Sequence, residues 1–232
     1  MTTVNILSGG AAQGLVRGLT ETFKAQTGLS IDGEFGAVGI MADRLRAGAP
    51  ADLVILTQAL LAKLAQEKLV VASSVADVGR VETALAVRSR DPRVVVKTEA
   101  DLRDVLRSAD AIYVPDTKAS TAGQHVAKVL DQLGIAYEVA SRLKIFPNGA
   151  TAMRELAAST AQRPIGCTQA TEIIATDGIA LSGSLPPGCE LVTMYAAGVT
   201  TRAAYPKEAA ALVAQLTGAD RRELRRRVGF AD

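Results

Sequence analysis

The chain has 232 residues, of which 48% are hydrophobic, and this apolar content can fill the core of one large domain or two small lobes and excludes a disordered chain. The net charge is only +2, with acidic and basic residues interspersed, which excludes a dedicated nucleic-acid surface. The one basic cluster, Arg221–Arg227, is expected to form the solvated face of a C-terminal helix.

The cysteine and histidine content argues against a metal site. Cys167 and Cys189 lie in no CxxC or Cys/His cluster, and the chain has one histidine. We therefore expect no bound metal and no cofactor. A disulfide between the two cysteines is an alternative that the sequence leaves open.

The first residues, MTTVNILSGG, contain no basic n-region, no long apolar h-region and no small-residue cleavage site. No apolar run approaches the roughly 20 residues that a membrane-spanning helix needs. We therefore expect no membrane insertion, and a cytoplasmic protein for the chain as written. If a leader has been removed, the expectation changes to a periplasmic protein.

The N-terminal part alternates between strand and helix patterns. Apolar runs predict strands, and apolar residues at helical spacing predict helices. We expect strands at 3–7, 30–36 and 51–57, and helices at 11–26, 38–48 and 58–70.

The remainder continues this alternation after an extended stretch at 80–92. We expect further helices at 99–109, 121–135 and 149–160, and two more that start near Pro206 and Ala219. Extended segments are expected at 110–116, within 138–148, at 163–170 and at 191–201, with a loop at 182–190.

Strands that alternate with helices predict an α/β protein with mostly parallel sheets. We expect two Rossmann-like lobes, 1–82 with 192–232 and 83–191, each with a mixed, mostly parallel sheet. Two extended crossings would join the lobes as a hinge, and a ligand cleft would lie between them.

Five junctions between a strand and a helix are rich in small and polar residues, and none uses Asp as its cap. Helix N-termini carry unpaired N–H groups and partial positive charge, and small side chains let an anion approach them. The alternative is that these residues only cap helices and form turns. We predict an anion-binding set made of Ser8, Gly9, Gly10, Ala37, Val38, Gly39, Ser120, Thr121, Ala122, Gly123, Asn148, Gly149, Ala150, Thr168 and Gln169.

Three segments carry a family resemblance. The segment 35–70, with the sequence AGAPAD at Ala47–Asp52, resembles the molybdate-binding component of bacterial ABC transporters. The segments TAGQHVAKVLDQLGI and RPIGCTQATEI resemble later motifs of that family in the same order. The resemblance covers nearly the whole chain and implies the two-lobed type II periplasmic-binding-protein fold, a small anionic ligand and, for an exported protein, an ABC permease as partner.

The chain departs from that family at the residues expected to contact the anion. Members present hydroxyl side chains at the first two junctions and often tyrosine at the last. This chain has Gly10 at the first, Ala37, Val38 and Gly39 at the second, and Gln169 near the tyrosine position. We therefore expect molybdate specificity to be lost and an organic acid to fit better.

Two other functions stay open beside a solute-binding protein. The wider superfamily includes aconitate isomerase, so an intracellular isomerase of an unsaturated di- or tricarboxylic acid is the alternative, and a ligand sensor is a third possibility. For an enzyme, His125 near a helix start is the candidate proton carrier, against a packed or surface histidine. Cys167, Glu172 and Asp116 are weaker candidates, because each has an ordinary structural interpretation.

Overall fold

The computed structural model describes residues 3–231, which form two compact units. Unit 1 contains the residues up to Val81 and from Thr193 onwards, and unit 2 is Glu82–Val192. The chain passes from one unit to the other within strand β4 (Ala76–Arg88) and at the start of strand β9 (Val192–Val199).

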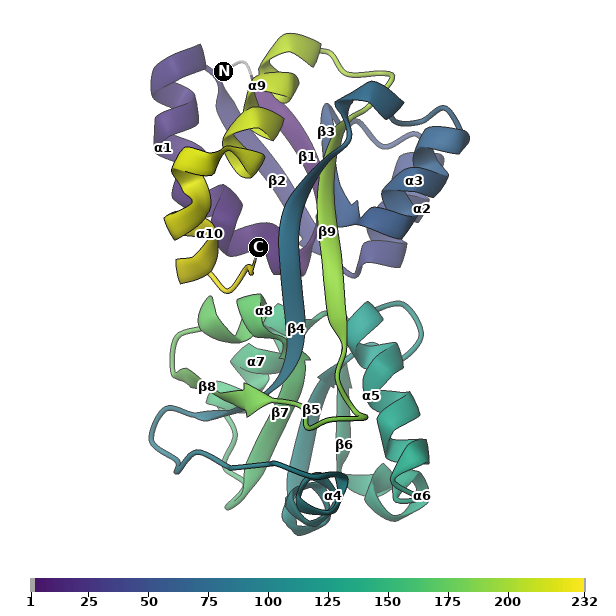
Figure 1. Cartoon of the computed structure of the whole chain (residues 1–232), viewed down its shortest axis with the longest axis vertical. Coiled ribbons are helices and arrows are strands. Elements are labelled where there is room, and N and C mark those ends of the chain that lie inside the picture. Colours follow the sequence, from purple (N-terminus) through teal and green to yellow (C-terminus); the bar gives the residue numbers. More distant parts are fainter. Residues whose placement is uncertain (1–2, 232) are drawn as a thin grey trace. The chain divides into compact units, whose positions relative to one another are not determined.

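Unit 1 is a mixed sheet with helices on both faces (Figure 1). Its strand order is β2-β1-β3-β9-β4, in which β1 pairs in parallel with β2 and β3, and β3 pairs antiparallel with β9. Helices α1, α9 and α10 cover one face, and α2 and α3 cover the other. The bounds are β1 Thr3–Gly9, β2 Ser30–Gly36, β3 Leu53–Thr57, α1 Gln13–Thr27, α2 Val38–Arg46, α3 Gln58–Gln66, α9 Pro206–Thr217 and α10 Arg222–Arg227.

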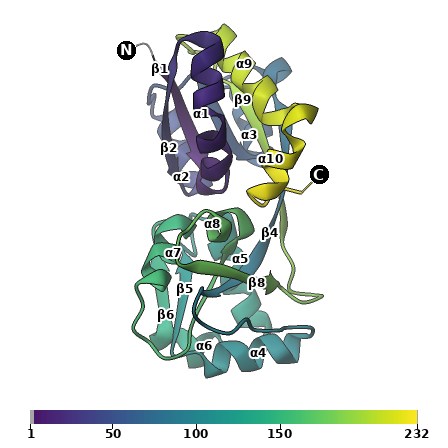
Figure 2. The same cartoon turned by 90° about the vertical axis from the view of Figure 1, so that its left-hand side faces the viewer.

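Unit 2 has the strand order β4-β7-β5-β6, with β8 paired to β4. Strand β5 pairs in parallel with β6 and β7, and β4 pairs antiparallel with β7 and β8. Helices α7 and α8 lie on one side of this sheet and α5 on the other (Figure 2). The bounds are β5 Ala111–Pro115, β6 Leu143–Phe146, β7 Pro164–Gln169, β8 Ile179–Ser184, α4 Glu99–Ser108, α5 Thr121–Gln132, α6 Ala136–Val139, α7 Gly149–Ala157 and α8 Ala170–Ile174.

Each unit buries its own hydrophobic core. In α1 the residues Leu15, Leu19 and Phe23 repeat every fourth position and are fully buried against the sheet. The helix ends at Gly28, whose φ of 73° suits glycine. In unit 2 the two faces of the sheet bury separate clusters, one around α4 and α5 and one around α7 and α8.

The predicted α/β class with mixed sheets is confirmed, and two local predictions are wrong. Helix α1 does not begin directly after the strand, because a 3-10 turn at Gly10–Ala12 precedes it. Helices α6 and α8 and strand β8 were not predicted, and β8 includes part of the predicted loop at 182–190. The last predicted helix begins as a 3-10 turn at Ala219–Arg221 before α10; further 3-10 turns lie at Ala72–Ser74 and Ala140–Arg142.

Within residues 3–231, none of the helices combines the length and the apolar character that crossing a bilayer requires.

Candidate functional site

The first two predicted junctions lie side by side in unit 1. Strands β1 and β2 run in parallel, and Gly9 pairs with Gly36 at their carboxyl ends. A Cβ atom on Gly9 would lie only 2.7 Å from Cγ1 of Val38 and 3.1 Å from the ring of Tyr195. Gly9 therefore allows the start of α2 to pack against the end of β1, so packing accounts for this glycine.

The polar groups at this edge are mostly backbone groups. Ser8 is fully buried within β1, and its hydroxyl donates to the carbonyl of Gly9 at 2.9 Å. Helix α2 starts after Ala37, which is extended and offers no side-chain cap to the N–H groups of the first turn. Gly10 begins the 3-10 turn, and Gly39 lies in the first turn of α2. An anion at this edge would meet peptide amides with few competing side chains.

The other three predicted junctions share one edge of the unit 2 sheet. The strands β7, β5 and β6 are neighbours, and both pairs are parallel, so their carboxyl ends lie at the same edge. Helices α5, α7 and α8 start from these ends. Cys167–Gln169 forms the last part of β7, within the extended segment expected at 163–170.

Two of the predicted polar side chains at this edge act as helix caps. Oδ1 of Asn148 accepts the N–H of Thr151 at 2.8 Å, and Oγ of Ser120 accepts the N–H of Gly123 at 3.5 Å. Gly123 itself is required by backbone packing, since a Cβ there would lie 2.2 Å from the carbonyl oxygen of Asp116. Thr121 and Ala122 form the first turn of α5.

Glu172 already fills the start of α7. Its carboxyl group accepts hydrogen bonds from the backbone N–H groups of Gly149, Ala150 and Gln169. The hydroxyl of Thr168 donates to its Oε2 at 2.6 Å. We call these four donors the amide cradle. The carboxyl group is almost fully buried, with 7% of the residue exposed.

Burial of Glu172 raises the pKa of its carboxyl group above the ordinary value of 4.5, because the charged form loses its water. The four hydrogen bonds of the amide cradle act in the opposite direction and limit this rise. In the sequence Glu172 was only a weaker candidate. The only available signal was an acidic residue just after an expected strand, which is common for structural reasons.

His125 does not lie free at a helix start. It is half-buried in the second turn of α5, and its Nε2 lies 2.8 Å from the carbonyl oxygen of Cys189. Because a carbonyl can only accept, Nε2 carries the proton and donates. The contact ties α5 to the loop before β9.

The two cysteines are free and buried. Burial raises the pKa of the Cys167 thiol to about 12, which removes the thiolate needed for nucleophilic chemistry. Burial, with Glu99 and Glu190 nearby, also raises the pKa of the Cys189 thiol. The disulfide that the sequence left open is not formed, and Cys167 is not a nucleophile.

Asp116 is also held by its own backbone. Its Oδ1 accepts the N–H groups of Lys118 and Ala119 at 2.7 and 2.9 Å, and these bonds lower the pKa of the carboxyl group. A carboxylate with a lowered pKa is a poor proton carrier near neutral pH. Within residues 3–231, no three His, Cys, Asp or Glu residues form a group that could hold a metal ion.

Asp52, the last residue of the AGAPAD segment, has a structural role. Its buried carboxylate accepts the N–H of Asn5 at 2.8 Å and those of Ala204 and Tyr205 at 2.6 and 3.0 Å. It therefore joins β1 to the segment that leads into α9.

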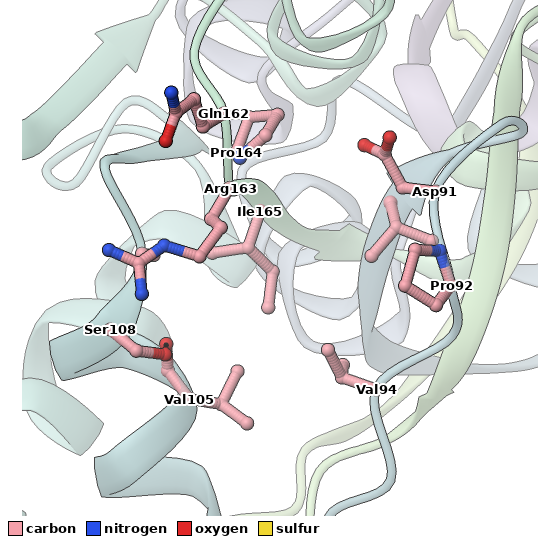
Figure 3. A pocket seen from close by; sticks show the side chains of 11 residues that line it. Asp91, Pro92, Val94, Val105, Ser108, Gln162, Arg163, Pro164 and Ile165 are labelled. Carbon is pink, nitrogen blue, oxygen red and sulfur yellow. Dashed lines mark hydrogen bonds between the residues drawn. The ribbon is translucent and has the colours of Figure 1, made fainter.

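A separate cavity of about 260 Å³ lies in unit 2 and contains none of the predicted site residues (Figure 3). Val94, Val105 and Ile165 form apolar walls, and Asp91 and Arg163 lie at its rim. Both charges are already paired, Asp91 with Arg88 and Arg163 with Asp110. The cavity lies by Pro164 and Ile165, where β7 begins, whereas the predicted residues lie where β7 ends.

A match to a family model over almost the whole described chain identifies the family. A model of the bacterial extracellular solute-binding proteins matches residues 4–231. The chain belongs to this family of solute-binding proteins. The resemblance to molybdate-binding members that the sequence indicated is confirmed at the level of the family and the fold.

Three known proteins are similar to this solute-binding protein over most of their length. Aconitate isomerase from Pseudomonas sp. is 26% identical over 231 residues, which cover 95% of this chain and 84% of the relative. The Azotobacter vinelandii periplasmic molybdate-binding protein has a TM-score of 0.80 at 18% identity, with 99% of each chain covered. The sulfate-binding protein SubI from Mycobacterium tuberculosis H37Rv has a TM-score of 0.76 at 19% identity, with 99% of this chain and 86% of SubI covered.

Proposed function

We propose that this solute-binding protein binds a small oxyanion or carboxylate at the helix starts described above. The observation that carries the proposal is the edge of unit 1, where β1 and β2 end side by side and α2 starts without a side-chain cap. Peptide N–H groups in such a place bind negative charge well, since the helix dipole adds to their hydrogen bonds.

The side chains at this edge favour a carboxylate over molybdate. Two structural relatives are named for binding molybdate and sulfate, which are tetrahedral oxyanions. In this chain the hydroxyl of Ser8 donates to a neighbouring carbonyl, and Gly10 and Ala37–Gly39 supply no hydroxyl group. An organic acid would use the backbone donors and fill the space beside these small residues. If this protein is exported, the partner of its loaded form would be an ABC permease.

Titration calorimetry and thermal unfolding with molybdate, tungstate, sulfate, citrate and both aconitates test this proposal. A true ligand at a hundredfold excess over its Kd stabilises the protein by about 2.7 kcal/mol. In unit 2, Thr121→Val removes one hydroxyl at the start of α5, while Thr160→Val makes the same change at an exposed position. Loss of affinity in Thr121→Val alone would support a ligand contact at the start of α5. Equal affinity of Thr121→Val and Thr160→Val would exclude Thr121 from the site.

An isomerase of an unsaturated di- or tricarboxylic acid is the second candidate, and its support is the similarity to aconitate isomerase across almost the whole chain. Proton NMR of trans-aconitate in D2O would show deuterium incorporation during turnover. His125→Gln keeps an N–H donor for the carbonyl of Cys189 but removes the imidazole. If His125 moves the proton, this variant loses at least about a hundredfold in exchange rate while it stays folded. Absence of deuterium exchange with the wild-type protein would contradict isomerase activity.

A further inference from the structure

The amide cradle has the composition of an anion site, yet a residue of the chain itself occupies it. Three backbone N–H groups and the Thr168 hydroxyl all point to one carboxyl group. A Cβ on Gly149 would lie 1.8 Å from Oε2 of Glu172 and 2.2 Å from Oγ1 of Thr168. Glycine at this position is therefore what lets a carboxyl group approach the start of α7, and that group is the chain's own.

The surroundings of the cradle contain few other charges. Helix α8 packs against α7, β7 and β8, and Glu172 is the only charged residue on α8. Strands β7 and β8 carry no charged residue. Arg154 and Glu155 on α7 are both exposed. The donors of the cradle, and not a cation, thus hold the carboxyl group in place.

We propose that Glu172 is a specificity-determining residue that closes the amide cradle of α7 to anions from solution. This proposal limits the donors that are open to a ligand in unit 2, and this consequence for the ligand rests on the anion-binding function proposed above. In unit 2 the ligand would have to use donors outside the cradle, such as those at the start of α5. The occupation of the cradle itself can be tested with no ligand bound.

Chemical rescue tests the occupation. Glu172→Ala leaves a space that matches acetate, because acetate corresponds to the glutamate side chain beyond Cβ. We expect this variant to have a lower Tm than the wild type, and acetate to raise that Tm with saturation at a millimolar dissociation constant. Chloride at equal ionic strength and neutral acetamide serve as controls. Glu172→Gln keeps the cradle filled, so acetate should raise the Tm of Glu172→Ala by more than it raises the Tm of Glu172→Gln or of the wild-type protein, in which any stabilisation by acetate comes from binding outside the cradle.

NMR of the wild-type protein covers the case in which Glu172→Ala does not fold. The amide protons of Gly149, Ala150 and Gln169 should titrate together with one midpoint as Glu172 changes charge. In Glu172→Gln that shared titration should disappear.

Several results would overturn the proposal. They are an acetate-dependent rise in Tm that is as large in Glu172→Gln as in Glu172→Ala, a folded Glu172→Ala whose Tm acetate does not change beyond the chloride control, and cradle amides that do not titrate together. A failure of the proposed anion-binding function would give other results. No anion would then stabilise the wild type, while the rescue of Glu172→Ala by acetate and the shared titration of the cradle amides would persist.

Discussion

Oε2 of Glu172 lies 1.8 Å from the point where residue 149 would place a Cβ atom. A methyl group cannot share that space with the carboxyl oxygen, and Oγ1 of Thr168 would also lie only 2.2 Å from it. The start of α7 therefore depends on glycine for a contact with a residue that is distant along the chain.

Gly149→Ala should destabilise the protein by about 1–3 kcal/mol or more, because the new methyl group overfills a closely packed site. Urea unfolding followed by circular dichroism measures this. Gly18→Ala in helix α1 is a suitable control, since its Cβ would meet the end of the Leu224 side chain at 3.0 Å, which can move at lower cost. Equal stability of Gly149→Ala and the wild type would contradict the position of Glu172.

Glu172→Gln should change how stability depends on pH. Because burial raises the pKa of Glu172 in the folded state, the folded protein holds this proton more tightly than the unfolded chain. The resulting stabilisation is complete below the unfolded value near 4.5 and is lost as the pH rises through the folded pKa. Urea unfolding of both proteins from acid to neutral pH should therefore show the advantage of the wild type over Glu172→Gln decreasing. An advantage that grows with pH would mean that the cradle lowers the pKa instead.

Asp52→Ala should lower the free energy of unfolding by about 2 kcal/mol, since it removes a buried carboxylate that accepts hydrogen bonds from three part-buried N–H groups. Asp43→Ala is the matched control, because its carboxylate is 76% exposed and only pairs with Arg46 on the same helix. Thermal unfolding compares the two. If Asp52→Ala were as mild as Asp43→Ala, the proposed tie between β1 and α9 would be wrong.

Both thiols should resist alkylation in the folded protein. With a pKa of about 12, only about one Cys167 thiol in ten thousand is ionised at pH 8, and Cys189 is fully buried. Mass spectrometry after iodoacetamide treatment should show no modification of the native protein and two modified cysteines after denaturation without a reductant. A disulfide, or rapid labelling of native Cys167, would contradict the structure.

The sequence predicted most of the fold because the signals were local. In α1, for instance, Leu15, Leu19 and Phe23 repeat with the period of a helix and indicate the buried face directly. Helix α8 has only five residues, too few for such a period to show. Strand β8 ends in a Ser-Gly-Ser segment, which is typical of a loop.

The candidate site was less accessible from the sequence. Small residues at strand ends were visible as a pattern, but what approaches each of them depends on contacts across the fold. Gly9 faces Val38 and Tyr195, and Gly149 faces Glu172. No periodicity or spacing links residue 149 to residue 172, so the internal partner of the cradle could not be predicted. The same limit applies to His125, whose partner is a carbonyl far along the chain.

Titration calorimetry of the wild type and Gly10→Val with small oxyanions and carboxylates tests whether backbone amides at the end of β1 bind an anion. Ala25→Val, which places the same side chain on an exposed face of α1, controls for the substitution. We expect saturable binding of at least one anion by the wild type and by Ala25→Val, and none by the folded Gly10→Val variant. Equal binding by Gly10→Val, or binding of neutral solutes only, would contradict this expectation.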